Sequence, residues 1–412
     1  MSLIANLQKN GSSVFQNRIA PITENRWSLE TRKKLFTDRI FITRMFYFVA
    51  LVFPLKPQET SRNKLCRRLL ENGSTLLLSL YIIGDLKNLF YLVWKLPMGL
   101  IFSSLFTDIF SITIRLTLLF KRQAILSAMV HLQDTFPRLQ PTKFVSQRLH
   151  MIIGLCGSCI IPIAFFWFTA DLCSQGSEAL LKVYVEDTFF GWSAENKWVS
   201  CVIFVTVDLL VVNQQYILFE FLLILSWYLL NLLKQTVESF VTEAVQEQDM
   251  ESLFESYIRY SRIISKCMSM VEEALSMLLL VLYGFMVFSI FSVTTYLMTA
   301  DLSVLPAMMV VPKLILFFVM MAGFYIVSFQ AVAVHEVAIK VKHTIHELVS
   351  VSDSSDFGMK CLLLTLATDF PSKVVVTCWG LFSVKRSFLQ KTASGMFTYA
   401  ILLSQLGNQT RH

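Results

Sequence analysis

Charged side chains inside long apolar segments are the residues of this sequence most able to do chemistry. Asp108 and Arg115 lie seven residues apart in one such segment, so they share a helix face, and Asp208 lies in another segment. A charge in the hydrocarbon of a membrane is costly, so it is usually paired inside a helix bundle or placed in a polar cavity. Pairing within the bundle and a polar ligand cavity are both compatible with these residues.

Other reactive residue types form no recognisable catalytic or metal-binding motif in the sequence. The GxSxG, GxxxxGK[ST], HExxH and GxGxxG patterns are absent. His343 and His346 can share a helix face, but no third ligand lies near them in the sequence. Cys156 and Cys159 interrupt an apolar run, which is typical of buried thiols. We therefore expect no enzyme activity, no cofactor and no metal ion.

The composition places these residues in a polytopic membrane protein. Of 412 residues, 55% are apolar and 16% are charged, and the mean hydropathy is +0.58. Soluble domains have about 45–50% apolar and about 25% charged residues. The net charge of +7 is typical of cytoplasmic loops in a membrane protein, so no nucleic-acid partner is expected. The predicted fold class is all-α, with membrane lipid as the surrounding partner.

Seven segments are long and apolar enough to cross about 30 Å of hydrocarbon as helices. The segment Met45–Leu55 is short for a span, so we place it at the membrane interface. If it crossed the membrane, the chain would have eight spans and the C-terminus would change sides. The seven predicted spans are 74–94, 100–120, 151–170, 198–230, 275–299, 305–334 and 394–408.

Loop charge predicts the orientation of these spans. Thirteen Lys and Arg residues lie in 1–70, which would share one side of the membrane with 121–150, 233–272 and 336–372. These four regions carry 25 Lys and Arg residues in total, against five on the other side. Because basic loops stay in the cytoplasm, the N-terminus is predicted inside and the C-terminus outside. A receptor coupled to G proteins has the inverse orientation. A secondary transporter would show internal repeats, and the two halves of the sequence share none.

The predicted cytoplasmic segments also carry helical stripes, which suggests that the spans extend into the cytoplasm and pack there. The segment 198–247 would be about 75 Å long as one helix. The stripes are Ile125, Met129, Leu132 and Phe136; Val237, Phe240, Val241, Ala244 and Val245; and Leu253, Tyr257, Tyr260 and Ile264.

The C-terminal span carries a sequence signature. Thr398 and Tyr399 are followed by Gln405 and Leu406, a pattern that closely resembles the TYxxxxxQF signature of insect gustatory receptors, with Leu406 in place of Phe. The stretch from Gly380 to Phe388 resembles the approach of that family to its last helix. Insect odorant receptors share the architecture and are the nearest alternative.

The resemblance implies a ligand-gated, non-selective cation channel in the plasma membrane of sensory neurons. It implies a homo- or heterotetramer of related subunits, with the last helix of each lining a central pore and the cytoplasmic helix extensions joining the subunits. Thr398, Leu402, Gln405, Leu406 and Gln409 fall near one face of the last helix, and the motif places Gln405 and Leu406 at the gate. Rings of Leu402 and Leu406 would form an apolar constriction that can close by dewetting.

The resemblance also implies that a small-molecule tastant binds within the outer half of the bundle. Sugar-sensing members often carry Glu after the TY pair, and Ala400 stands here, which favours bitter-type or other non-sugar ligands. An aromatic-lined cavity with a few polar groups suits an amphipathic molecule, although each aromatic side chain can equally pack against a neighbouring helix. The candidate pocket residues are Asp108, Phe165, Trp167, Asp208, Phe288, Tyr296, Lys313 and Phe317.

The predicted organisation has four parts. An N-terminal cytoplasmic and interfacial segment, 1–70, precedes a six-helix ligand-binding bundle, 71–335, with cytoplasmic extensions. A cytoplasmic anchor region, 336–390, precedes the pore-lining helix and short outer tail, 391–412. Cys173 and Cys201 would both lie at the outer face, where a disulfide can form, and two free thiols are the alternative.

Tagging each terminus tests the predicted orientation. On intact cells, antibody should reach a C-terminal tag and not an N-terminal tag. The reverse result would favour a G-protein-coupled receptor. Two hidden tags, on protein shown to reach the surface, would mean that Met45–Leu55 crosses the membrane.

Overall fold

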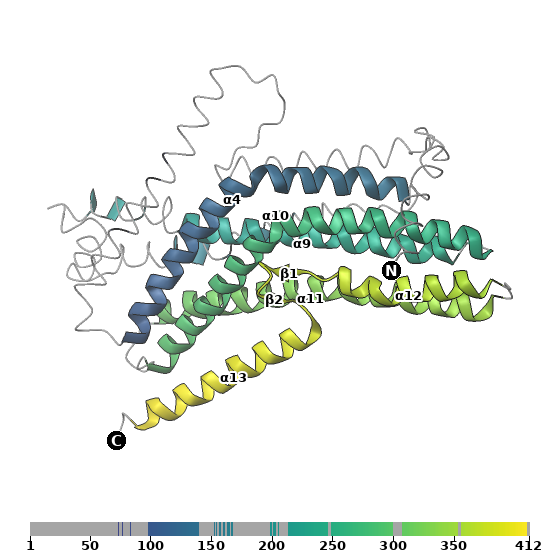
Figure 1. Ribbon diagram of the computed structural model, residues 1–412. Coiled ribbons are helices and arrows are strands. Elements are labelled where there is room, and N and C mark those ends of the chain that lie inside the picture. Colours follow the sequence, from purple (N-terminus) through teal and green to yellow (C-terminus); the bar gives the residue numbers. More distant parts are fainter. Residues whose placement is uncertain are drawn as a thin grey trace, which may run out of the picture.

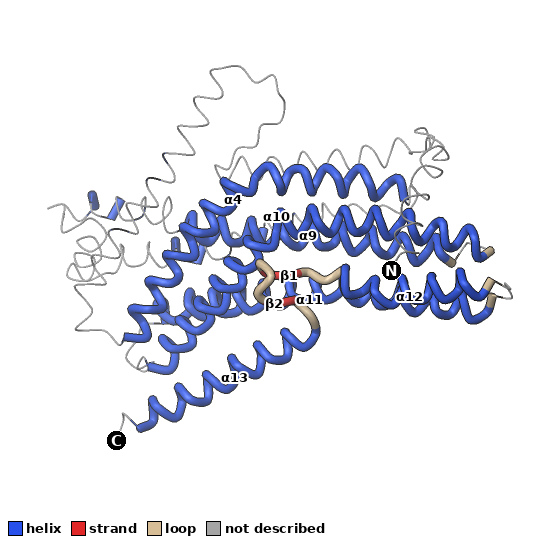
Figure 2. The backbone as a smooth tube through the Cα atoms, in the orientation of Figure 1, coloured by secondary structure: helices blue, strands red, loops and turns tan. Residues whose placement is uncertain are grey.

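Long helices form almost all of the part of the chain that the computed structural model describes. This part comprises 98–139, 213–245, 249–299, 307–352 and 356–409, with isolated positions in 73–83, 152–167 and 198–205. Figures 1 and 2 show the order of its helices and strands along the chain. The elements are α4 (Met98–Leu139), α9 (Asn213–Ala244), α10 (Met250–Thr299), α11 (Ala307–Val351), α12 (Phe357–Lys373), β1 (Thr377–Cys378), β2 (Phe382–Ser383) and α13 (Arg386–Gln409).

The helices α4, α9, α10 and α11 pack side by side, and α12 folds back along α11 (Figure 1). Their shared core contains fully buried large side chains such as Phe219, Tyr228, Phe285 and Phe324. The predicted cytoplasmic stripes turn toward this core. The stripe residues that are buried are Ile125, Met129, Leu132, Val237, Phe240, Ala244, Leu253, Tyr257, Tyr260 and Ile264. The predicted packing of these stripes is confirmed at these positions, whereas Val245 lies in the turn after α9 and is exposed. Their cytoplasmic location stays a prediction.

Among the described residues, three helical stretches are long and apolar enough to cross a membrane. They are Tyr216–Thr242, Met250–Leu297 and Val310–Val351, and they overlap the predicted spans 198–230, 275–299 and 305–334. The predicted segments 1–70, including Met45–Leu55, and most of 74–94 and 151–170 lie outside the described residues. The count of seven spans and their orientation therefore stay predictions.

Aspartate caps begin two of the helices. At the start of α10 the backbone N–H of Ser252 donates to Oδ1 of Asp249 at 2.8 Å, and this hydrogen bond holds the pKa of Asp249 below its ordinary value. At the start of α12 the N–H of Met359 donates to Oδ1 of Asp356 at 3.1 Å. Both caps satisfy backbone donors that the first helical turn leaves without a partner.

The last helix begins eight residues earlier than the predicted span 394–408, at Arg386. Its first two turns combine Phe388 and Leu389 with Arg386, Ser387, Gln390 and Lys391, so hydropathy does not mark them, but backbone hydrogen bonds to Lys385 close the first turn. The apolar stretch 374–383 before it forms a short hairpin instead of a helix. Trp379 and Gly380 have φ of 51° and 70°, which ends any helix at that point.

Close packing of α4 on α10 generates a stability prediction. A Cβ added at Gly284 would lie 2.4 Å from the ring of Phe110, and that ring is held 5.4 Å from Phe288. Gly284→Ala should therefore lower stability by about 1–3 kcal/mol through overpacking. Gly395→Ala, where nothing lies within 4 Å, is the matched control. Thermal unfolding of the purified protein in detergent should show a loss for Gly284→Ala alone, and equal midpoints would contradict this packing.

Candidate functional site

A tight hairpin connects α12 to α13. Strands β1 and β2 are antiparallel, with Thr377 opposite Ser383 and Cys378 opposite Phe382. The chain reverses over Trp379 and Gly380, whose left-handed φ angles favour glycine. The N–H of Trp379 donates to Oγ of Ser276 at 2.8 Å, which helps to hold this uncommon backbone conformation at a bulky residue.

The hairpin is fixed to α10 and α11. One turn of α10 before Ser276, Glu272 accepts a hydrogen bond from the Thr377 hydroxyl. Val374 approaches Nδ1 of His335 on α11 through its carbonyl, at 3.4 Å. Cys378 is completely buried in this contact, and burial raises the pKa of its thiol to about 12, so the thiol is neutral at physiological pH. The start of α13 is therefore held by both long helices.

Four aromatic side chains join the hairpin, α13, α10 and α11, and we call them the aromatic junction: Phe382, Phe388, Tyr283 and Phe324. The rings of Phe382 and Phe388 stack at 4.8 Å, and Tyr283 meets Phe388 edge-on at 5.5 Å. Tyr283 also meets Phe324 at 5.4 Å, and its hydroxyl lies 2.9 Å from Oγ of Ser328. Aromatic pairs of this geometry contribute roughly 0.5–1.5 kcal/mol each beyond their burial. The junction thus connects three helices at the first turn of α13.

A second contact holds α13 three turns further along. The hydroxyl of Tyr399 lies 3.0 Å from Oγ1 of Thr295, and its ring centroid lies 4.4 Å from that of Phe291 on α10. Phe388, Leu389 and Met396 also pack against the core from this side of α13. Tyr399 of the C-terminal signature is therefore a contact between the last helix and the bundle.

Many of the described side chains in the rest of α13 are exposed. Phe397 is 70% exposed and Leu402 is 52% exposed, and Thr398 and Gln405 are exposed as well. An open groove of about 640 Å³ runs along this helix. All of its lining residues come from α13: Gln390, Lys391, Ser394, Gly395, Thr398, Tyr399 and Leu402. The groove is thus a free face of one helix and not a cavity between helices.

Two predicted gate residues have side chains outside the described set, Leu406 and Gln409, although both lie within α13. Leu402 and Gln405 lie on exposed faces. The role of all four at a gate stays a prediction.

The candidate pocket residues are only partly brought together. The ammonium of Lys313 lies 5.9 Å from the centre of the Tyr296 ring, so α10 and α11 bring this pair together. Phe288 contacts Phe110 of α4, and Phe317 packs against the core and Phe318. Trp167 is 66% exposed. Phe165, Asp208 and the side chain of Asp108 lie outside the described residues.

Other sequence candidates are placed as follows. Arg115 and Glu220 are buried in the bundle, on α4 and α9. Cys201 is buried and disulfide-bonded. Cys173 lies outside the described residues, so its pairing with Cys201 stays a prediction.

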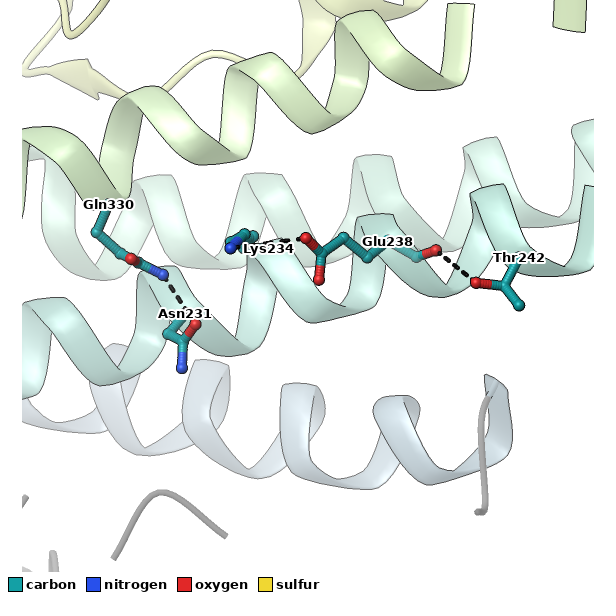
Figure 3. A network of polar contacts seen from close by, with 5 residues as sticks. All are labelled: Asn231, Lys234, Glu238, Thr242 and Gln330. Carbon is teal, nitrogen blue, oxygen red and sulfur yellow. Dashed lines mark hydrogen bonds and ion pairs between the residues drawn. The ribbon is translucent and has the colours of Figure 1, made fainter. Parts of the chain in front are cut away.

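Polar side chains in the second half of α9 pair with α11 and with one another (Figure 3). Nε2 of Gln330 on α11 donates to Oδ1 of Asn231 at 2.9 Å, which links the two helices. One turn later Lys234 lies 3.6 Å from Glu238, and the hydroxyl of Thr242 donates to the Glu238 carbonyl at 3.4 Å.

Sequence reasoning missed the contribution of α10 to this site. Tyr283, Ser276 and Glu272 contact the hairpin, but no sequence motif distinguishes them from other helical residues. Phe382 and Phe388, the partners of Tyr283, did stand out in the sequence, within the stretch that resembles the approach to the last helix.

Comparison with known proteins identifies the family. The profile of the 7tm chemosensory receptor family matches residues 99–409. The fold is similar to that of the insect olfactory receptor OR5 from Machilis hrabei, with 13% identity, a TM-score of 0.60, and 90% of this chain and 100% of that chain covered. The structure of OR5 in complex with eugenol matches at 14% identity and a TM-score of 0.59, with the same coverage. No curated protein sequence matches the chain. The chain, a multi-pass membrane protein, therefore belongs to the 7tm chemosensory receptor family.

Proposed function

We propose that this protein is a taste receptor that acts as a ligand-gated, non-selective cation channel, with α13 lining the pore of a homo- or heterotetramer. The observation that carries the proposal is the exposure of α13. It contacts the bundle through the aromatic junction, Tyr399, the core residues Leu389 and Met396, and the ion pair of Arg386 with Glu336, whereas Lys391, Phe397, Thr398, Ile401, Leu402 and Gln405 are exposed. A helix with both polar and apolar free faces needs both water and further apolar surface around it.

Helical geometry separates the two free faces. At about 100° per residue, Lys391, Thr398, Leu402, Gln405 and Gln409 fall within a stripe about 60° wide. Phe397 and Ile401, which are also exposed, lie roughly 100° away around the helix. In a membrane the polar stripe requires a water-filled path, whereas Phe397 and Ile401 suit lipid or a neighbouring subunit. Four copies around an axis satisfy both requirements.

The proposed gate follows from the polar stripe. A ring of Leu402 would form an apolar constriction, and a ring of Gln405 would offer amide dipoles to hydrated cations. Such a ring has no rigid set of carbonyl ligands, so selectivity among monovalent cations is expected to be weak.

The proposed ligand is a small amphipathic molecule. OR5, which shares the fold, has been seen in complex with eugenol, and this supports a small-molecule site in the present chain. Lys313 and Tyr296, together with Phe288 and Phe317, are the described candidates to line it. We favour a non-sugar tastant because of Ala400, and an odorant is the second candidate because the similar solved structures are olfactory receptors. A G-protein-coupled mechanism is disfavoured by the charge of the loops.

Gln405→Arg should suppress cation current. Four guanidinium groups at a constriction repel cations, and we expect currents to fall by about tenfold or more. The control is Gln123→Arg, at an exposed glutamine of α4. Currents evoked by eugenol and by a panel of bitter alkaloids should be recorded from cells with matched surface expression. Undiminished current in the Gln405→Arg protein would remove α13 from the pore.

Phe388→Ala should uncouple the ligand site from the gate. The substitution removes the ring that contacts Phe382, Tyr283 and Phe324, so α13 would no longer follow movements of α10 and α11. We expect a smaller maximal response together with a loss of stability of about 2–4 kcal/mol. Phe388→Leu should keep part of the maximal response and part of the stability. Phe357→Ala, at an exposed ring of α12, should change neither the response nor the stability. Concentration–response curves that coincide for Phe388→Ala and Phe357→Ala would refute the coupling role.

A further inference from the structure

The inner end of the polar stripe of α13 contains one charged residue, Lys391, that has no role in the proposed gate. Lys391 is the one charged residue among those that line the open groove, and it is exposed. Among the described residues it forms no ion pair. Arg386, five residues earlier on a different face, instead pairs with Glu336 of α11 at 2.8 Å. The two cations at the start of α13 thus have different surroundings.

Lys391 lies on the same face of α13 as the proposed gate residues. Thr398 follows it by about 10 Å along the helix axis, and Gln405 by about 21 Å. Ser394 and Gly395 lie between them, and nothing lies within 4 Å of the position that a Cβ at Gly395 would occupy. Because both residues are small, the helix is thin at this level. A pore lined by four such helices would therefore be wide and hydrated beside the lysine.

We propose that Lys391 from each subunit forms a ring of four positive charges at the inner mouth of the pore, and that this ring limits the outward flow of cations. The inference rests on the proposed channel function and adds a residue that sets rectification. Four charges about one Debye length from the axis lower the local cation concentration about threefold at physiological ionic strength. Cations that enter from outside reach the gate before they meet this ring, so inward current is affected less.

Single-channel recording from excised patches tests the proposal, with Na⁺ as the permeating ion in symmetrical solutions. Lys391→Gln should raise the outward current about threefold and the inward current much less, which makes the current–voltage relation more linear. Lys391→Arg should behave as the unsubstituted protein, and Lys391→Glu should exceed Lys391→Gln. Raising the salt concentration should shrink every difference, because screening shortens the reach of the ring.

Lys385→Gln is the matched control, since Lys385 is also exposed but precedes α13. If Lys385→Gln changes the outward current as much as Lys391→Gln, general charge at the membrane surface is responsible and the ring is refuted. If Lys391→Gln leaves the outward current unchanged while Gln405→Arg still blocks it, the ring is refuted and the channel function stands.

An electron cryo-microscopy map of the purified assembly gives an answer that needs no current. Four Lys391 side chains around a central axis would support the ring. Lys391 side chains directed to lipid headgroups would overturn it, even in a tetramer. An assembly without a central α13 helix would overturn the proposed function itself.

Discussion

The stacking of Phe388 on Phe382 is the contact on which the position of the last helix depends. It lies where the hairpin, α10 and α11 meet, and Tyr283 and Phe324 close around it. Without it, α13 would keep only the contact through Tyr399 and the packing of its first turns. Because one aromatic group joins three helices, a small rotation of α10 against α11 must either move α13 or break the stack.

The hairpin fixes the direction in which α13 leaves the bundle. Hydrogen bonds from Thr377 and Trp379 to α10 and the burial of Cys378 hold the hairpin in one orientation. The left-handed turn at Trp379 and Gly380 then reverses the chain within three residues. As a result α13 leaves the bundle at an angle and ends away from α12 (Figure 1). Among the described residues, Lys391, Thr398, Leu402 and Gln405 of its polar stripe are exposed.

Helical periodicity predicted much of this fold, because apolar stripes in cytoplasmic segments have few alternatives to burial. Ile125, Phe240 and Tyr257 all lie in the core as expected. The early start of α13 at Arg386 could not be predicted from hydropathy, since its first turns mix polar with apolar residues and are held by tertiary contacts. The role of Tyr283 was hidden for a similar reason: an aromatic residue in an apolar helix carries no mark of its partner. The short signature at Thr398, Tyr399 and Gln405 indicated the family because its meaning comes from known relatives and not from physics alone.

The uninterrupted length of α10 has a consequence for how this family can change during evolution. This 50-residue helix holds the hairpin at Glu272 and Ser276 and the last helix at Phe291 and Thr295. Inserting or deleting one residue between Ser276 and Phe291 would rotate one set of contacts by about 100° against the other. Length variation should therefore be excluded from this interval of α10, whereas single substitutions on its free face can accumulate. New ligand preferences would then arise by replacement of side chains on a helix of constant length.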